Sequence, residues 1–211
     1  MLRIEESFRK LRENLERMTG IVREMLAIIE KAINEEEFSQ LDQIFTKDAL
    51  LDELEKEMDN NAIQLLALIN PVATDLRFVF SVIKLNVDLE RIGDECKNVA
   101  KELRSVEKPL PEEFKTLARK VPEMVFAGFQ ALIKQDSSLA RKIVLMDDEI
   151  DKLEYEILNK YPKSIGLAFA AKALERIADH TTNIAENVVY VTEGVDIRHE
   201  NTIMKRLNKK E

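Results

Sequence analysis

The chain has 211 residues, of which 45% are hydrophobic and 34% are charged, with only five glycines, five prolines and no tryptophan. Few helix breakers among many Ala, Leu, Ile, Glu and Lys residues indicate long helices, and the length suits two domains of about 100 residues. The net charge of −8 argues against nucleic acid as the main partner, because neutralising phosphates requires a basic surface.

Cysteine usage and hydropathy indicate the compartment. Cys96 is the single cysteine, so no intrachain disulfide can form, and we expect it to be a small core residue in a reducing compartment. The longest apolar runs, such as 62–69, are far shorter than a membrane span of about 20 residues. The N-terminus also lacks the basic-then-apolar pattern of a secretion signal. We therefore expect a soluble, cytoplasmic protein.

The first half of the chain is predicted to form three helices. Apolar residues recur every three or four positions over 4–32, which indicates an amphipathic helix. Asn34 and the glutamates after it predict the end of this helix and the start of a second, which Pro71 stops. A third helix is predicted over about 72–104, and the prolines of segment 105–111 indicate a linker between two halves.

The second half is predicted to repeat this pattern. Its first helix contains Pro122, which either kinks it or marks its start. The next helix is predicted over about 137–160 and is followed by a break at Pro162. The last helix runs to about Glu193, where Gly194 supplies a left-handed stop.

The two halves are related by an internal duplication. Residues 89–100 align with residues 174–185 and are identical at seven of twelve positions. Upstream, residues 48–57 align with residues 147–156 through two aspartates, a leucine and two glutamates. A duplicated three-helix unit accounts for both alignments.

The predicted fold class is therefore all-α, with two tandem three-helix bundles made of six long antiparallel helices. The first bundle covers residues 1–106, and the second covers residues 107–211. The second hairpin is shorter, because 21 residues separate Glu154 from Glu175, against 35 between Glu55 and Glu90. We expect the far end of the second bundle to be reshaped accordingly.

Acidic residues occur at matched positions of the two copies, in pairs four residues apart that share one helix face. They are Asp48, Asp52, Glu90 and Asp94 in the first copy, and Asp147, Asp151, Glu175 and Asp179 in the second. Counting outward from Pro71 places each pair of the first hairpin opposite the other. The second hairpin, counted from Pro162, is offset by only two residues, about 3 Å of helix rise.

Carboxylates that converge in this way raise one another's pKa unless they are salt-bridged or metal-bound. Oxygen ligands suit iron, manganese, zinc, magnesium or calcium, so the pattern predicts two cation sites. Glu90 and Asp94 lie off the apolar seam of their helix, which predicts a patch near the bundle surface. The alternative is a solvated acidic stripe, paired with the basic residues Arg91, Lys97, Lys101 and Arg176.

Enzymatic functions find little support in the sequence. It contains no Ser/His/Asp arrangement, glycine-rich phosphate loop or Cys–His pairing. A ferritin-like di-iron oxidase would need Glu-x-x-His pairs, and neither His180 nor His199 has a glutamate three residues earlier. We expect His180 on a helix surface, and we expect no enzyme activity.

The motifs Glu90-Arg-Ile-Gly-Asp94 and Glu175-Arg-Ile-Ala-Asp179, together with Asn70-Pro71, resemble the paired signatures of the PhoU family across essentially the whole chain. The resemblance implies two three-helix bundles. It also implies multinuclear clusters of divalent or trivalent metal ions (iron, zinc, manganese or magnesium) held by the eight acids named above, with Asn98 and Asn183 as further candidate ligands.

The same resemblance implies a role for the chain and partners for it. PhoU proteins act as negative regulators of phosphate-starvation signalling through a phosphate ABC transporter and a phosphate-sensing histidine kinase. A homodimer, held by its partners at the inner face of the membrane, is the expected assembly. A metal-free helical adaptor or scaffold protein is the alternative function.

Overall fold

The computed structural model describes residues 2–69 and 73–198, and within these ranges it contains six α-helices and no strand. The helices are α1 (Leu2–Glu35), α2 (Asp42–Ile69), α3 (Ala73–Leu103), α4 (Glu112–Lys134), α5 (Ser137–Lys160) and α6 (Ile165–Glu193). The predicted all-α fold class is confirmed. Asn70 and Pro71, to which the break between α2 and α3 was assigned, lie outside the described residues.

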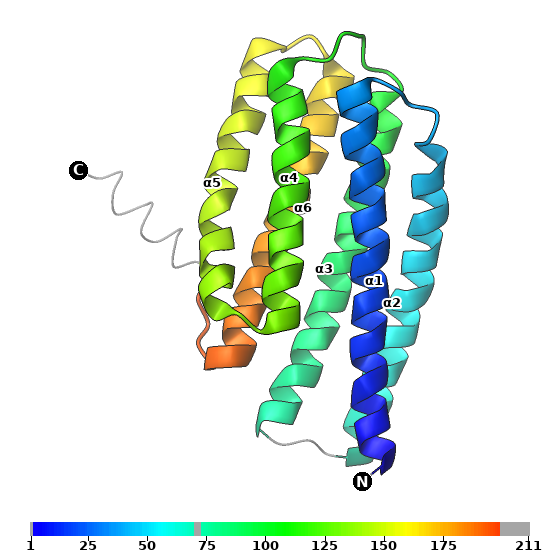
Figure 1. Ribbon diagram of the computed structural model, residues 1–211, viewed down its shortest axis with the longest axis vertical. Helices are drawn as coiled ribbons and strands as arrows, with labels where there is room; N and C mark the ends of the chain where they lie inside the picture. The colour runs from blue at the N-terminus through cyan, green and yellow to red at the C-terminus, as the bar shows by residue number, and fades with distance from the viewer. Residues whose placement is uncertain (1, 70–72, 199–211) are drawn as a thin grey trace, which may run out of the picture.

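The six helices form two three-helix bundles that lie side by side. Figure 1 shows α1 and α4 nearest the viewer, α3 and α6 behind them, and α2 and α5 at the two sides. α1, α2 and α3 pack against one another, as do α4, α5 and α6. The bundles meet where α3 packs against α6 and α1 against α4, and the contact between α3 and α6 is the most extensive of any helix pair described.

One hydrophobic core runs through both bundles. The apolar seam of α3, which includes Leu89, Ile92 and Cys96, is fully buried, and so is Ile177 on α6. Burial raises the pKa of the Cys96 thiol, which keeps it protonated and unreactive. Cys96 is thus the core residue that its place in the sequence predicts.

The connection between α1 and α2 differs from the prediction. Glu36 has a φ of 54°, in the left-handed region, and the N–H of Glu37 bonds to the carbonyl of Ala32 at 3.2 Å. This turn closes α1 and delays the start of α2 to Asp42. The Glu36 carboxylate also accepts a bond from Lys115 at 2.8 Å, so the turn is fixed to the second bundle.

The second bundle follows the predicted pattern closely. α5 spans the predicted residues, and α6 ends before Gly194, whose φ of 72° is the left-handed stop. Pro122 lies inside α4 and is buried there, so it does not mark the start of that helix. Figure 1 shows the first hairpin, α2 and α3, reaching beyond the C-terminal end of α6, in keeping with its greater length.

Candidate functional site

The first acidic patch lies across the α2–α3 hairpin. The helices approach closely at Gly93, where an added Cβ would lie 2.4 Å from Leu51 Cδ2 and 3.7 Å from Asp48 Oδ1. Asp48 of α2 therefore lies beside the Glu90–Asp94 segment of α3. Asp48 is buried and Asp94 half-buried, so this patch is less exposed than the sequence predicts.

A lysine joins the acids of the first patch. Lys97 Nζ lies 2.5 Å from Asp48 Oδ2 and 2.8 Å from Asp94 Oδ1, so it links the two helices. Arg91 lies further out, with Nε 3.5 Å from Glu90 Oε2 and Nη1 3.6 Å from Asp94 Oδ2. Much of the negative charge of this patch is thus neutralised by the protein itself.

Glu90 and Asp94 have opposite pKa shifts. Burial and the charge of Asp94 raise the pKa of Glu90 to about 7. Burial alone would also raise the pKa of Asp94, but its hydrogen bond to Lys97 and the charge of that lysine lower it below its usual value. At neutral pH Asp94 is therefore ionised, while Glu90 is partly protonated and hydrogen-bonded to it.

Asp52 lies one turn beyond Asp48, next to acids that the prediction did not include among the ligands. Burial, followed by the charges of Asp59 and Asp52, raises the pKa of Glu55. Glu55 in turn contributes to the raised pKa of Glu90. Asp52 is therefore connected through Glu55 of α2 to Glu90 of α3.

The second patch lies across the α5–α6 hairpin and is centred on Glu175. Only 10% of the Glu175 side chain is exposed. Lys172 Nζ lies 2.9 Å from Glu175 Oε1 and 3.8 Å from Oε1 of Glu154, a buried residue of α5. The other carboxylate oxygen, Glu175 Oε2, is buried and has no hydrogen-bond partner. One oxygen of this patch is therefore left for a further ligand.

Electrostatic interactions connect the other acids of the second patch. Burial raises the pKa of Glu175, and the charges of Asp179 and Asp151 contribute to the shift. Neighbouring atoms shield the Asp179 carboxyl from water and, with the charge of Asp151, raise its pKa as well. Asp147 lies half-buried on α5, one turn before Asp151. Three of the four predicted acids thus influence one another across the hairpin.

Polar residues connect α3 and α6 between the two patches. Arg176 Nη1 lies 3.3 Å from Glu95 Oε1, and Asp88 Oδ1 lies 3.1 Å from both Asn183 Nδ2 and His180 Nδ1. His180 therefore takes part in the contact between the bundles and is not simply the surface residue that we expected. The amide of Asn183 donates across this contact, and that of Asn98 donates to Glu95 at 3.1 Å.

The acidic side chains of the two patches, in the conformations described, do not form a complete metal-binding site. Over residues 2–69 and 73–198, no group of three or more His, Cys, Asp or Glu side chains is arranged to hold a metal ion. The donor set still suits a hard or borderline cation, because it consists of carboxylate oxygens and includes the unpartnered Glu175 Oε2. Metal binding would require these side chains to rotate toward a common centre.

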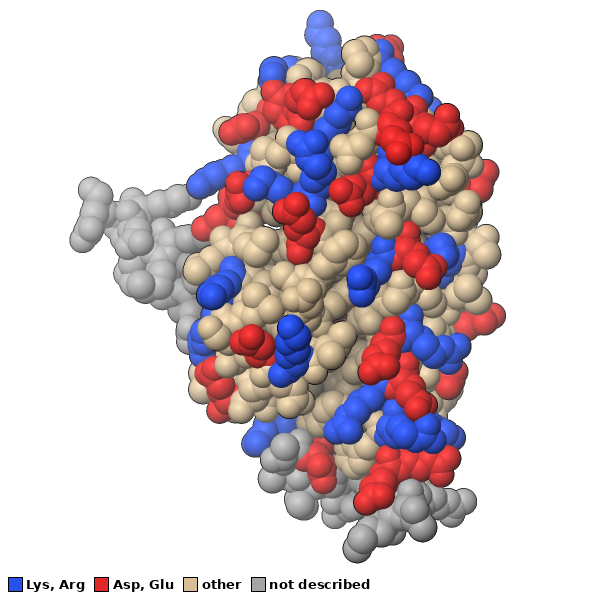
Figure 2. All heavy atoms as spheres, viewed as in Figure 1, with Lys and Arg blue, Asp and Glu red and all other residues tan. Residues whose placement is uncertain are grey.

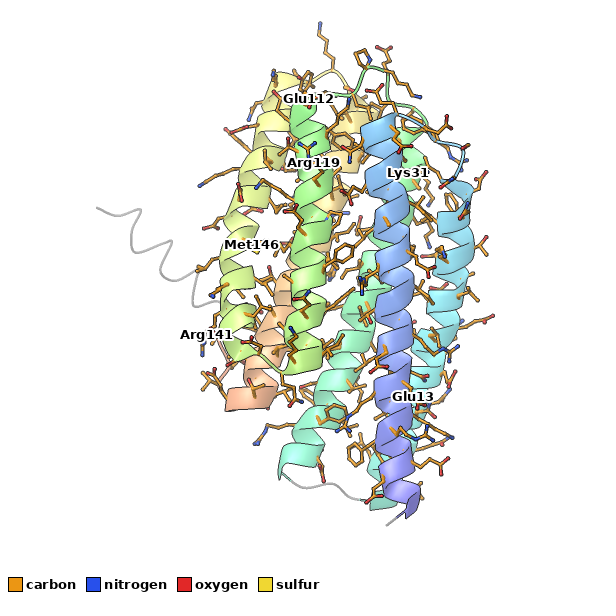
Figure 3. All side chains as sticks on the ribbon, in the orientation of Figure 1. Glu13, Lys31, Glu112, Arg119, Arg141 and Met146 are labelled. Carbon is orange, nitrogen blue, oxygen red and sulfur yellow. The ribbon has the colours of Figure 1, made fainter. Side chains whose placement is uncertain are left out.

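The face that α1 and α4 present to the viewer has a different character. Figure 2 shows Lys and Arg interspersed with Asp and Glu over much of this face, separated by uncharged areas. Figure 3 labels Glu13 and Lys31 on α1 and Glu112 and Arg119 on α4, at the near side of the molecule. Arg9 and Glu13 form an ion pair of 2.6 Å there. The acidic patches belong instead to the hairpins beside and behind these helices.

Comparison with known proteins gives the family. The family model described as the PhoU domain matches twice, over residues 15–103 and 114–188. The chain belongs to the PhoU family. The two matched segments correspond to the two bundles, and each contains one of the acidic hairpins.

Relatives and solved structures agree with this assignment. The chain is 29% identical to a phosphate-specific transport system accessory protein PhoU homologue of Clostridium acetobutylicum, with 92% of this chain and 95% of that protein covered. It is 31% identical to the homologue of Aquifex aeolicus, with 92% and 96% covered.

The fold is shared with solved PhoU structures. The crystal structure of PhoU from Pseudomonas aeruginosa superposes with a TM-score of 0.84 at 27% identity, covering 90% of this chain and 99% of that one. PhoU from Streptococcus pneumoniae, described as a phosphate transport system regulatory protein, gives a TM-score of 0.82 at 25% identity, with 92% and 98% covered. Among the residues described here, no helix is both long and apolar enough to cross a membrane.

Proposed function

We propose that this PhoU-family chain is a regulatory accessory protein of phosphate uptake that binds metal ions in its acidic patches. The regulatory part is supported by its relatives, which are named phosphate-specific transport system accessory proteins. The chain acts through association with other proteins, and no bond is made or broken. Its partners are a phosphate transporter and a phosphate-sensing histidine kinase, toward which it is a negative regulator when phosphate is plentiful.

The single observation that carries the metal-binding part is the state of Glu175. Nine-tenths of its side chain is buried, and Lys172 pairs with Oε1 only, so a further cation or a proton at the unpartnered Oε2 would stabilise this carboxylate. Burial, together with the charges of neighbouring acids, raises the pKa of Glu175 and of Asp179, so a proton or a further cation is favoured beside these carboxyls. A metal ion would supply that charge and hold α5 against α6.

The ligands proposed for each patch are the acids that the duplication places together. They are Asp48, Asp52, Glu90 and Asp94 on the first hairpin, and Asp147, Asp151, Glu175 and Asp179 on the second. Iron, zinc, manganese and magnesium, as divalent or trivalent ions in multinuclear clusters, all accept such oxygen ligands. The bound metal fixes the packing of each hairpin and so the surface that is presented to partners.

A metal-free helical adaptor is the second candidate, because Lys97, Arg91 and Lys172 already neutralise several of these acids. Elemental analysis of protein purified without chelator separates the two. Metal content that drops in the Asp94→Asn, Asp179→Asn double variant supports metal binding. Equal and negligible metal in the parent and this variant supports the adaptor.

The matched control for this experiment replaces two exposed acids of α1. The Glu6→Gln, Glu13→Gln double variant removes the same amount of charge from exposed positions near the start of α1, so its metal content should equal that of the parent. A drop of the same size in the control would mean that metal binds loosely to the acidic surface as a whole, and the proposed sites would be wrong.

The regulatory part has its own tests. Deletion of the gene should release phosphate-starvation genes from repression in phosphate-rich medium, and unchanged repression would contradict the proposed role. The proposed homodimer should sediment at twice the mass of the chain in analytical ultracentrifugation. A single species at the mass of one chain across the accessible concentrations would contradict it.

A further inference from the structure

A cavity lies where the second bundle ends beside the first. α4 ends at Lys134 and α6 at Glu193, and Figure 1 shows α1 and α3 continuing past both of these ends. The cavity has a volume of about 130 Å³ and is lined by residues of α1, α3, α4 and α6. Figure 2 shows a largely uncharged area between the bundles at this level. Both bundles therefore contribute to one enclosed space, and none of its lining residues belongs to an acidic patch.

Apolar side chains form most of the wall of this cavity. They come from all four helices and include Leu15, Phe78, Val82, Leu85, Leu132 and Val188. In another protein, a cavity of about 150 Å³ lined by Leu, Ile and Phe binds benzene. The cavity between the bundles therefore suits a ligand with a single ring.

One polar group in the wall has no partner. Ser81 of α3 is 1% exposed, and its Oγ makes no hydrogen bond in the described structure. A helical serine can bond back to the carbonyl one turn earlier, but Ser81 does not. Thr19 of α1, which also lines the cavity, already donates its hydroxyl proton to the carbonyl of Glu16 at 3.0 Å. A ligand hydroxyl that pairs with Ser81 would satisfy a buried group that is otherwise unfavourable.

The exposed rim of the cavity has one positive charge. Arg12 of α1 lines the cavity, and its guanidinium carbon lies 5.3 Å from the centre of the Phe78 ring. The adjacent Glu13 pairs with Arg9, and Arg12 forms no ion pair within the described part of the chain. Glu16 is the other charged residue of the described lining. One arginine beside one acid suits a singly charged carboxylate and disfavours the doubly charged phosphate ion.

We propose that this cavity binds a small phenolic carboxylic acid, with the ring among the apolar side chains, the phenol hydroxyl against Ser81 and the carboxylate at Arg12. The site goes beyond the proposed function and is independent of metal binding. Because its wall comes from both bundles, the bound acid would hold α4 and α6 against α1 and α3. Phenolic acid binding would thus stabilise the junction of the two bundles.

The rim favours a small molecule over a segment of a partner protein. Ile133 is the only exposed large apolar side chain among the described lining residues. The other exposed members of the rim are charged or polar, namely Arg12, Glu16, Gln135 and Thr192. A protein segment would need an apolar groove that continues beyond the cavity, as in the known modes of helix and strand recognition.

NMR titration of the full chain with para-hydroxybenzoate tests the proposal. This ligand should bind at one site and raise the melting temperature of the chain. Benzoate, which lacks the hydroxyl, should bind about fivefold more weakly, as expected for one lost hydrogen bond. The uncharged para-hydroxybenzamide should bind about threefold more weakly, because the interaction with an exposed arginine is screened by water. Inorganic phosphate should not compete with para-hydroxybenzoate.

Two variants assign the ligand groups to residues. Ser81→Ala should weaken para-hydroxybenzoate about fivefold and leave benzoate unchanged, so that both acids bind this variant equally. Arg12→Gln should weaken both acids about threefold and leave para-hydroxybenzamide unchanged. The matched controls Ser105→Ala and Arg9→Gln should change nothing, because Ser105 lies beyond the other end of α3 and Arg9 is paired with Glu13.

The Ser81→Ala variant also reports on the free hydroxyl without any ligand. Because the Ser81 hydroxyl has no partner, its removal should not lower the urea concentration at which the chain unfolds. A clear decrease would mean that the hydroxyl is bonded within the protein, and the role given to Ser81 would be wrong.

Three binding results would overturn the proposal. The first is that para-hydroxybenzoate does not bind to the parent chain. The second is that Ser81→Ala weakens benzoate as much as para-hydroxybenzoate, which would mean that Ser81 does not recognise the hydroxyl. The third is that N-acetyltyrosinamide binds more tightly than para-hydroxybenzoate, in which case the cavity receives an aromatic side chain of a partner protein. None of these results bears on metal binding by the acidic patches.

Discussion

Lys97 should be one of the most important charged residues for the stability of the metal-free protein. Lys97→Met keeps the length of the side chain but removes the ammonium group that joins Asp48 to Asp94. The buried Asp48 would then lack its cationic partner, and nearby acids would repel it. We expect the variant to fold but to unfold at a lower urea concentration than the parent.

The size of the effect follows from burial. Exposed ion pairs contribute about 0–1 kcal/mol, whereas breaking a buried pair costs about 3–5 kcal/mol. Lys97 and Asp94 are partly exposed and Asp48 is not, so we expect a loss of about 2 kcal/mol. In a chain of this length that loss lowers the melting temperature by about 4–8 °C.

Urea denaturation in the presence of EDTA measures this loss. Asp48→Asn and the Lys97→Met, Asp48→Asn double variant complete a double-mutant cycle that isolates the interaction between the two side chains. We expect a coupling of about 1–2 kcal/mol from the cycle, because the pair is short and mostly buried. The exposed Lys101→Met variant should stay within about 0.5 kcal/mol of the parent.

Two results would refute this reasoning. A Lys97→Met variant as stable as the parent would mean that the cost of desolvating the lysine cancels its attraction to the acids. A cycle with no coupling, despite a loss of stability, would mean that Lys97 acts through the packing of its aliphatic stem and not through its charge.

Three other predictions concern pH, the core and a helix end. The raised pKa of Glu90, about 7 against 4.5 in the unfolded chain, means that the folded state holds an extra proton between these values. Stability in EDTA should therefore increase by about 1 kcal/mol from Glu90 as the pH falls from about 7.5 to about 5, after allowance for solvent screening, and Glu90→Gln should reduce the pH dependence by that amount in urea titrations. Phe114→Ala should lower the free energy of unfolding by about 3–5 kcal/mol, because it removes a large buried side chain. Calorimetry should still show a single unfolding transition, because the core is continuous between the bundles. Two separated transitions would contradict this. Gly194→Ala should lower the free energy of unfolding by about 1 kcal/mol, measured by thermal unfolding, because the backbone at this position is left-handed. An unchanged melting temperature would show that the end of α6 is frayed in solution.

Much of the fold could be predicted because local signals agreed with one another. α5 was predicted over its observed residues, since its apolar spacing, the break at Pro162 and the acids of the duplication were mutually consistent. The start of α2 was predicted too early, because the left-handed turn at Glu36 is made by a residue type with no preference for it. The Glu36 side chain also pairs with Lys115 from the other bundle, a contact that the local sequence does not reveal.

The candidate site was predictable in position but not in its bonding. Counting residues from Pro71 is enough to bring Asp48 opposite Asp94, because helix rise is constant. The same counting does not decide that Lys97, first considered only as one of several surface partners, bonds to both acids. The contact of His180 with Asp88 was also missed, because it requires knowing that α3 packs against α6. A basic residue three positions after an acid was the one available signal for Lys97.

The unequal length of the two hairpins gives the molecule a direction. If the two hairpins had equal length, the molecule would present the same surface outline to a partner in two orientations. Here the α2–α3 hairpin extends past α6, and its end bears the exposed apolar side chains of Leu68, Leu76 and Phe80. A partner protein that binds this longer hairpin can therefore hold the molecule in one orientation only. Each copy of the chain then binds the partner at one place.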